Sequence, residues 1–235
     1  MEELQAPVGK LRIAFTTEPW GPYPVDPEIV KEIENVASVC KDMGHVVEQA
    51  SPSLDYLKVN KVVMNMFGMA DIRLADFAET MGREISLDYL EPATLKMIEH
   101  AKDLTLTEIM TSFEVMRQAR LTLGQFFENH DLLLTPSLSL LPQPHGLFST
   151  KRDDLDPEDF WENDFRFFQH MGLFNVTGTP SISLPLCQSK SGLPIGVQFA
   201  ARFGDEAALI RIAAAFEEAM PWNGRKPPIH VSAKR

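Results

Sequence analysis

The sequence predicts an α/β protein, in which a mixed β-sheet is packed by helices. Residues 11–47 have the pattern of a strand, a helix and a second strand, and residues 175–222 have that of two strands and a closing helix. Between these two parts, residues 54–129 are mainly helical in pattern. Strand and helix patterns that follow one another in this way are typical of helices layered on a sheet.

The first strand is predicted at residues 11–16, and the following helix begins at Asp26 and Pro27. Aspartate is a favourable N-cap, and proline is favourable at the first helical position. Gly44 ends this helix, and a second strand begins at His45. A unit of this length predicts a right-handed crossover that joins two parallel strands.

The central part is predicted to hold helices at residues 56–69, 71–81 and 92–101. Thr105 and Glu108 form a capping box, which begins the longest helix. The apolar residues at helical spacing predict the buried stripe of this helix: Ile109, Phe113, Met116, Leu123 and Phe127.

The last part is predicted to begin with a buried strand at residues 131–135 and an aromatic-rich helix at residues 160–174. Two short strands follow, at residues 181–186 and 195–200, and Asp205 is the expected N-cap of the closing helix. Apolar residues at helical spacing are expected to face the core from that helix: Leu209, Ile212, Phe216 and Met220.

The length and composition are those of a globular chain. It has 235 residues, of which 44% are hydrophobic. We expect residues 1–235 to form a single α/β domain, with residues 1–9 and 223–235 as flexible ends.

The net charge of −11 argues against nucleic acid and anionic membrane surfaces as partners. The acidic start lacks the apolar segment of a signal peptide, and no apolar run approaches the roughly 20 residues that cross a bilayer.

The cysteines and histidines predict neither a disulfide framework nor a metal site. Cys40 and Cys187 are expected to be buried thiols, which fits a cytoplasmic location. The six histidines include no pair at the spacing that places two ligands on one helix face, so we predict no metal. A G-x-S-x-G turn, a P-loop and a dinucleotide fingerprint are also missing from the sequence. Ser181 and Ser183 alternate with apolar residues, and we expect them to pack in a half-buried strand.

An ordered set of short motifs lies within the last part of the chain. It consists of N-x-x-G-x-P at Asn175, Gly178 and Pro180, then G-L-P-I-G-V-Q at residues 192–198, then an acidic pair at residues 205–206. This set resembles the C-terminal end of the amidase signature family, most closely the branch of bacterial aryl and cyclic-amide hydrolases. The resemblance covers most of the chain. It implies the C-terminal half of an amidase-signature fold, with a large mixed sheet between helices.

The resemblance also implies the chemistry of a complete enzyme. The family hydrolyses carboxamide C–N bonds with two serines and a lysine, and its serines lie in a Gly/Ser-rich segment of the N-terminal half. This sequence has no such run, and Lys10 is better explained as a solvated residue before the first strand. We therefore assign no catalytic residue to this chain and expect it to be inactive alone. The resemblance implies no cofactor.

The resemblance implies that this half of the fold forms one wall of the substrate cleft. The residues that it places there are Thr135, Pro136, Asn175, Thr177 and Gly178. For Asn175 a structural role in its own turn is favoured over substrate contact, because asparagine side chains readily bond nearby backbone. Gly178 is expected to supply a backbone conformation that a Cβ would hinder.

Two functions remain open from the sequence. The chain is either part of a hydrolase that acts on a small amide, with a complementing N-terminal half, or a non-catalytic scaffold that self-associates. Removal of half a fold leaves apolar surface exposed, and large exposed apolar patches usually mark association. An exposed face that is apolar favours a fragment, whereas charges on that face favour a chain that exists alone.

Overall fold

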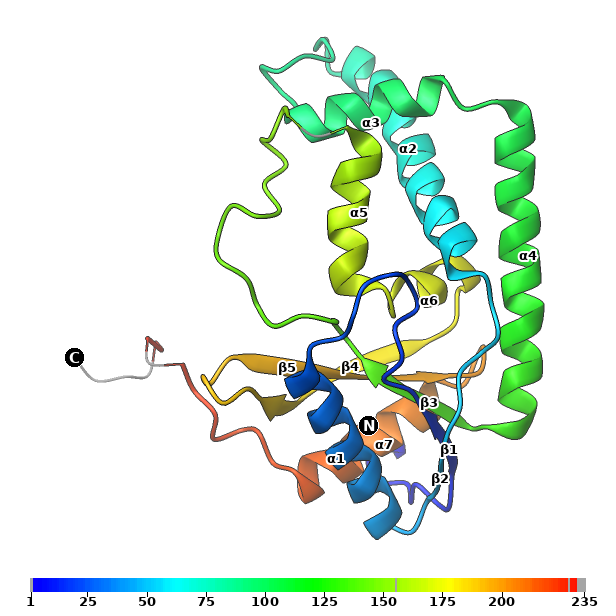
Figure 1. The fold of residues 1–235 in the computed structure, drawn as a ribbon, viewed down its shortest axis with the longest axis vertical. Helices are drawn as coiled ribbons and strands as arrows, with labels where there is room; N and C mark the ends of the chain where they lie inside the picture. Colours follow the sequence, from blue (N-terminus) through cyan, green and yellow to red (C-terminus); the bar gives the residue numbers. More distant parts are fainter. Residues whose placement is uncertain (1, 155, 228, 232–235) are drawn as a thin grey trace.

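The computed structural model describes residues 2–154, 156–227 and 229–231. At its centre is a mixed sheet, in which the strand order of the described chain is β2-β1-β3-β5-β4 (Figure 1). The strands are β1 (Arg12–Phe15), β2 (Val46–Gln49), β3 (Leu132–Pro136), β4 (Ser181–Gln188) and β5 (Pro194–Ala201). β1 pairs in parallel with β2 and β3, whereas β5 pairs antiparallel with β3 and β4. The predicted fold class is confirmed.

Helices cover both faces of this sheet (Figure 1). α1 (Pro27–Asp42) and α7 (Glu206–Ala219) lie on one face. The other face carries α2 (Tyr56–Thr80), α4 (Leu106–Asn129), α5 (Pro157–Phe168) and α6 (Gly172–Thr177). α3 (Pro92–Lys102) packs against α2 and α5, and a short 3-10 helix, η1 (Glu2–Leu4), contacts α7.

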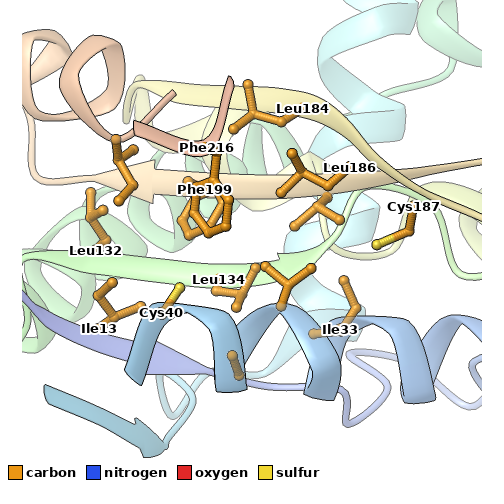
Figure 2. Packing of buried hydrophobic residues seen from close by; sticks show 14 of the residues in the cluster. Ile13, Ile33, Cys40, Leu132, Leu134, Leu184, Leu186, Cys187, Phe199 and Phe216 are labelled. Carbon is orange, nitrogen blue, oxygen red and sulfur yellow. The ribbon is translucent and has the colours of Figure 1, made fainter. Parts of the chain in front are cut away.

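The sheet separates two hydrophobic clusters because side chains alternate along a strand. Leu132 and Leu134 point toward α1 and α7, whereas Leu133 points toward the helical block. Figure 2 shows the first cluster, in which Phe199 of β5 meets Phe216 of α7 at a ring-centroid distance of 5.3 Å.

The first strand–helix–strand unit is formed as expected. The side chain of Asp26 accepts a hydrogen bond of 2.8 Å from the amide of Glu28, and so caps α1. Gly44 has a φ of +92°, the left-handed conformation that glycine adopts without strain as the chain leaves the helix. β1 and β2 are parallel, as predicted.

The central helices differ from the prediction in one respect. The expected helices at residues 56–69 and 71–81 form the single helix α2. Its middle contains no proline, and it packs closely against α3 there. A Cβ added at Gly68 would lie 3.1 Å from the Cβ of Ala101. Packing against a neighbour therefore carries the helix through a point where the pattern predicted a break.

The capping box of α4 is confirmed, but part of its predicted buried stripe is wrong. Met116, Leu123 and Phe127 are buried, whereas the side chain of Phe113 is 54% exposed. α4 carries two neighbouring apolar stripes, and the periodicity alone does not say which one meets the core. α4 consequently exposes apolar side chains at Leu106, Met110 and Phe113.

The last part of the chain shows two further differences. The aromatic segment at residues 160–174 contains most of α5, a connection and the first half of α6, rather than one helix. β4 continues past Pro185 to Gln188. Proline is tolerated there because the pairing of β4 with β5 shifts register between Leu184 and Cys187, so the regular ladder is interrupted at Pro185.

Both cysteines are buried free thiols, as expected, and burial raises the pKa of each to about 12. In the described part of the chain, no helix is long and apolar enough to cross a membrane.

The chain ends contact the folded part where they are described. Glu3 pairs with Arg211 at 2.9 Å, and Arg225 donates to the carbonyl oxygens of Pro185 and Leu186. Residues 1, 228 and 232–235 of the expected flexible ends lie outside the described residues. The single domain with flexible ends stays a prediction.

Candidate functional site

Two of the five expected cleft residues lie at the carboxyl end of β3. Thr135 and Pro136 are buried and pair with Gln198 and Val197 of β5. The Nε2 of Gln198 donates to the hydroxyl of Thr135 at 3.0 Å and to the carbonyl oxygen of His170 at 3.1 Å. The polar side chain of Thr135 is therefore bonded inside the protein, and Gln198 joins it to the connection between α5 and α6.

The same connection holds a buried histidine. The Nε2 of His170 lies 2.9 Å from the carbonyl oxygen of Glu18, which can only accept, so Nε2 carries the proton. Nδ1 can then accept a hydrogen bond from the hydroxyl of Ser139, at 3.4 Å. Burial lowers the pKa of His170 to about 4, and the imidazole is neutral at pH 7. Because it is enclosed, His170 binds the loop at Glu18 to the sheet and is not accessible to a substrate.

The serines of β4 lie on the exposed face of a half-buried strand, as expected, because Ser181 and Ser183 are exposed whereas Leu184 is buried. The hydroxyl of Ser183 lies 2.6 Å from that of Ser137, which is not a base. A Cβ added at Gly196 would lie 2.9 Å from the Oγ of Ser137 and 3.1 Å from that of Ser183, so the glycine leaves room for this pair. The environment of Ser183 supplies no group that would remove its proton.

Thr177 and Gly178 lie elsewhere, at a cavity of about 460 Å³. Its other lining residues include Arg120, Phe127 and Arg202. Gly178 ends α6 with a φ of +70°, which fits the expected special backbone conformation. The three hydroxyl contacts of Thr177 are local: the carbonyl oxygens of Leu173 and Phe174 and the hydroxyl of Thr179.

Asn175 does not lie in the turn that the sequence predicted. It lies within α6, which ends only at Gly178, and its side chain is exposed. The helix continues through this position because its neighbours Phe174 and Val176 are buried against the core.

The five expected residues therefore lie in two places. The amide of Ala201 donates to Pro180 at 3.1 Å, and Ala201 pairs with Leu132. The segment after Gly178 thus lies next to Leu132, the first residue of β3. Thr135 lies near the other end of the same strand. Whether both places border one substrate cleft stays a prediction.

Sequence reasoning missed the two arginines of the cavity. They come from α4 and from the turn after β5, and no sequence motif joins positions so far apart. Gln198, in contrast, belongs to the G-L-P-I-G-V-Q motif, which did indicate that it matters. Among the described residues, no group of three or more His, Cys, Asp or Glu side chains is placed to hold a metal ion.

A mixed sheet between two helical layers defines an α/β protein, and the comparisons with known proteins give its family. The sequence profile described as Amidase matches residues 2–210. The chain belongs to the amidase family.

Relatives among characterised sequences are similar over most of this chain. The 6-aminohexanoate-cyclic-dimer hydrolase of Paenarthrobacter ureafaciens is 29% identical over 230 residues, which are 94% of this chain and 46% of the relative. The putative amidase AmiC of Mycobacterium tuberculosis is 31% identical over 199 residues, which are 83% of this chain and 41% of the relative.

Solved structures of amidases have the same fold as this chain. The structure of 6-aminohexanoate cyclic dimer hydrolase complexed with substrate superposes with a TM-score of 0.86 at 27% identity, over 97% of this chain and 48% of that one. A bacterial aryl acylamidase of the amidase signature family has a TM-score of 0.78 at 22% identity, over 94% of this chain and 46% of that one, and so shares the fold. The predicted resemblance to cyclic-amide and aryl-amide hydrolases is confirmed. The chain spans about half the length of these relatives.

Proposed function

We propose that this chain supplies one half of an enzyme that hydrolyses a small carboxamide, and that the nucleophile belongs to polypeptide outside it. The observation that carries this proposal is the match to 6-aminohexanoate-cyclic-dimer hydrolase. That match takes in 97% of this chain but 48% of the solved relative.

In this proposal the missing half attacks the amide carbonyl with a serine, while a second serine and a lysine transfer protons. The amine leaves, and water then releases the acid from the acyl-enzyme. This chain forms part of the cleft wall with Thr135, Pro136, Asn175, Thr177 and Gly178. The mechanism uses no cofactor. Buried free thiols at Cys40 and Cys187 favour a reducing compartment, and we propose the cytoplasm.

The isolated chain is expected to be inactive, because its nucleophilic side chains are not activated. The thiols of Cys40 and Cys187 are buried, with pKa values raised to about 12, so neither forms a thiolate at neutral pH. His170 is enclosed, and among the described residues the hydrogen-bond partner of the Ser183 hydroxyl is another hydroxyl. An enzyme that loses its nucleophile and base loses most of its rate enhancement.

One surface supports association with a partner. Along the outer surface of α4, Leu106, Met110 and Phe113 are exposed by 75%, 59% and 54%. We name these three residues the α4 apolar stripe. A complementing half would cover it in an amidase, and a second copy would cover it in the alternative function, a non-catalytic scaffold.

The test is an amide-hydrolysis assay on the purified chain, with a panel of small amides that includes the cyclic dimer of 6-aminohexanoate. The chain is assayed alone and after co-expression with the unmatched half of the Paenarthrobacter ureafaciens hydrolase. We expect no turnover by the chain alone and turnover by the co-expressed pair. Turnover by the chain alone that is lost in Ser183→Ala would place a nucleophile on β4 and overturn the proposal. Absence of turnover from the pair would favour the scaffold.

A further inference from the structure

We propose that the cavity between α4, the end of α6 and the turn after β5 binds an amphipathic monocarboxylate, that is, an acid with an aryl or alkyl chain. The cavity is the one of about 460 Å³ that Arg120, Gly124 and Arg202 help to line. Its volume lies within the range of small-molecule sites. Thr177 and Gly178, which the proposed function places in the cleft wall, also line this cavity. Binding requires no turnover, so it can be tested on the chain whether or not the amidase function holds.

The carboxylate is assigned to the two arginines. The Nε of Arg120 donates to the carbonyl oxygen of Thr177 at 3.2 Å, and the Nε of Arg202 donates to Asp205 at 3.1 Å. Each guanidinium is held in place by this bond. Within the described part of the chain, its two terminal nitrogens make no hydrogen bond. Two parallel N–H donors on a planar guanidinium match the two oxygens of a carboxylate.

The surrounding charges indicate which of the two arginines contributes more to binding a carboxylate. Asp205 pairs with Arg202, and Asp131 lies close enough to Arg202 for the two charges to interact. The hydrogen-bond partner of Arg120 is a neutral carbonyl group. Neither aspartate lines the cavity, whose lining residues include no acidic side chain. Since the whole chain has a net charge of −11, a cavity with this composition is unusual in it. Arg120 is therefore expected to contribute more to binding than Arg202.

The rest of the cavity is apolar. Leu123 and Phe127 form part of its lining from α4, and Phe203 is 83% exposed at the turn after β5. An exposed aromatic ring that lines the same cavity as the two arginines offers an apolar contact for the body of a ligand whose carboxylate binds those arginines. A simple inorganic anion would use only the arginines, whereas an acid with an aryl chain would use both surfaces.

Gly124 supports a binding role for this space. Glycine is less favourable than alanine inside a helix, and Gly124 lies well within α4. A Cβ added there would meet no atom within 4 Å, whereas one added at Gly68 would lie 3.1 Å from Ala101. Packing explains Gly68 but does not explain Gly124. The missing side chain at Gly124 instead leaves the cavity open.

The test uses isothermal titration calorimetry on the purified chain with 4-phenylbutyrate, its neutral amide 4-phenylbutyramide and inorganic phosphate. We expect 4-phenylbutyrate to bind at least tenfold more tightly than either of the other two. Arg120→Gln should weaken this binding by about tenfold, which is roughly 1.4 kcal/mol, and Arg202→Gln should weaken it by less. Arg117→Gln is the matched control on α4, because Arg117 pairs with Glu114 and does not line the cavity.

Gly124→Leu separates binding from folding. It should fill the cavity and abolish binding, while its melting temperature equals or exceeds that of the unaltered chain. The proposal is overturned if 4-phenylbutyrate does not bind, if the amide or phosphate binds equally well, or if Gly124→Leu retains binding. Loss of binding in Arg117→Gln to the same extent as in Arg120→Gln would also overturn it, because the effect would then be one of general charge.

Discussion

Individual side chains in this protein have properties that depend on contacts distant in sequence. His170 lies beside Gln169, yet its partners are the carbonyl oxygen of Glu18 and the hydroxyl of Ser139. Its ring also lies 4.9 Å from that of Trp20, measured between centroids. Enclosure by these groups makes the neutral imidazole the stable form.

This burial predicts a pH dependence of stability. Burial lowers the pKa of His170 from 6.5 to about 4, so between these values the unfolded chain binds a proton that the folded chain does not. The free energy of unfolding should therefore fall as the pH drops from 6.5 to 4, by up to about 3 kcal/mol from this residue.

Asp164 acts in the opposite direction, because burial raises its pKa from 3.8 to about 6. Its folded form retains a proton that the unfolded form releases, so its contribution grows as the pH falls through this window.

Urea unfolding between pH 4 and pH 7 separates the two residues. Asp164→Asn should lose stability more steeply than the unaltered chain as the pH falls. His170→Gln should lose it less steeply or gain it. Equal slopes in all three proteins would mean that neither residue titrates with a shifted pKa.

At the scale of elements, the ends of the helices follow from local sequence. Asp26, Asp55, Thr105 and Asp205 each accept a hydrogen bond from a backbone amide of the helix that follows. Because these contacts span only a few residues, the sequence predicted the caps at Asp26, Thr105 and Asp205. The cap at Asp55 was seen only in the structure. The interior of an element depends instead on what packs against it, as the uninterrupted α2 demonstrates.

The cap of α4 gives a prediction at this scale. The side chain of Glu108 accepts from the Thr105 amide at 2.8 Å, and the amide of Glu108 donates to the Thr105 hydroxyl at 3.2 Å. Thr105→Ala should lower the free energy of unfolding by about 1 kcal/mol, because amides of the first turn lose their partner. Thr107→Ala, an exposed position in the same turn, should change it by less than about 0.5 kcal/mol. Urea denaturation at pH 7 measures both, and equal effects would contradict the role of the cap.

At the scale of the whole molecule, the sheet is covered on both faces but open at its edges. β2 and β4 are the edge strands of the described sheet. The α4 apolar stripe adds exposed hydrophobic side chains on the helical side of the sheet, where Figure 1 places α4. That this stripe belongs to the face left open by a missing half stays a prediction.

The apolar stripe predicts self-association of the purified chain. The apparent mass in sedimentation velocity should increase with concentration. Phe113→Glu should reduce this increase, because a charge placed in an apolar contact must be desolvated. Thr111→Glu adds the same charge at an exposed position on α4 outside the stripe, and should leave association largely unchanged. A chain that remains monomeric at every concentration, or equal effects of the two variants, would contradict this role for the stripe.

The sequence by itself determined the fold class, most of the elements, three of the helix caps and the family, because those signals are local. Periodicity, capping residues and the ordered motif from Asn175 to Gln198 all act over a few turns or strands. Tertiary structure alone decided which apolar stripe of α4 is buried, which residues enclose His170, and that Arg120 and Arg202 line one cavity. These features join positions far apart in the chain. Their geometry depends on how α4, α6 and β5 pack around the sheet, which no local pattern specifies.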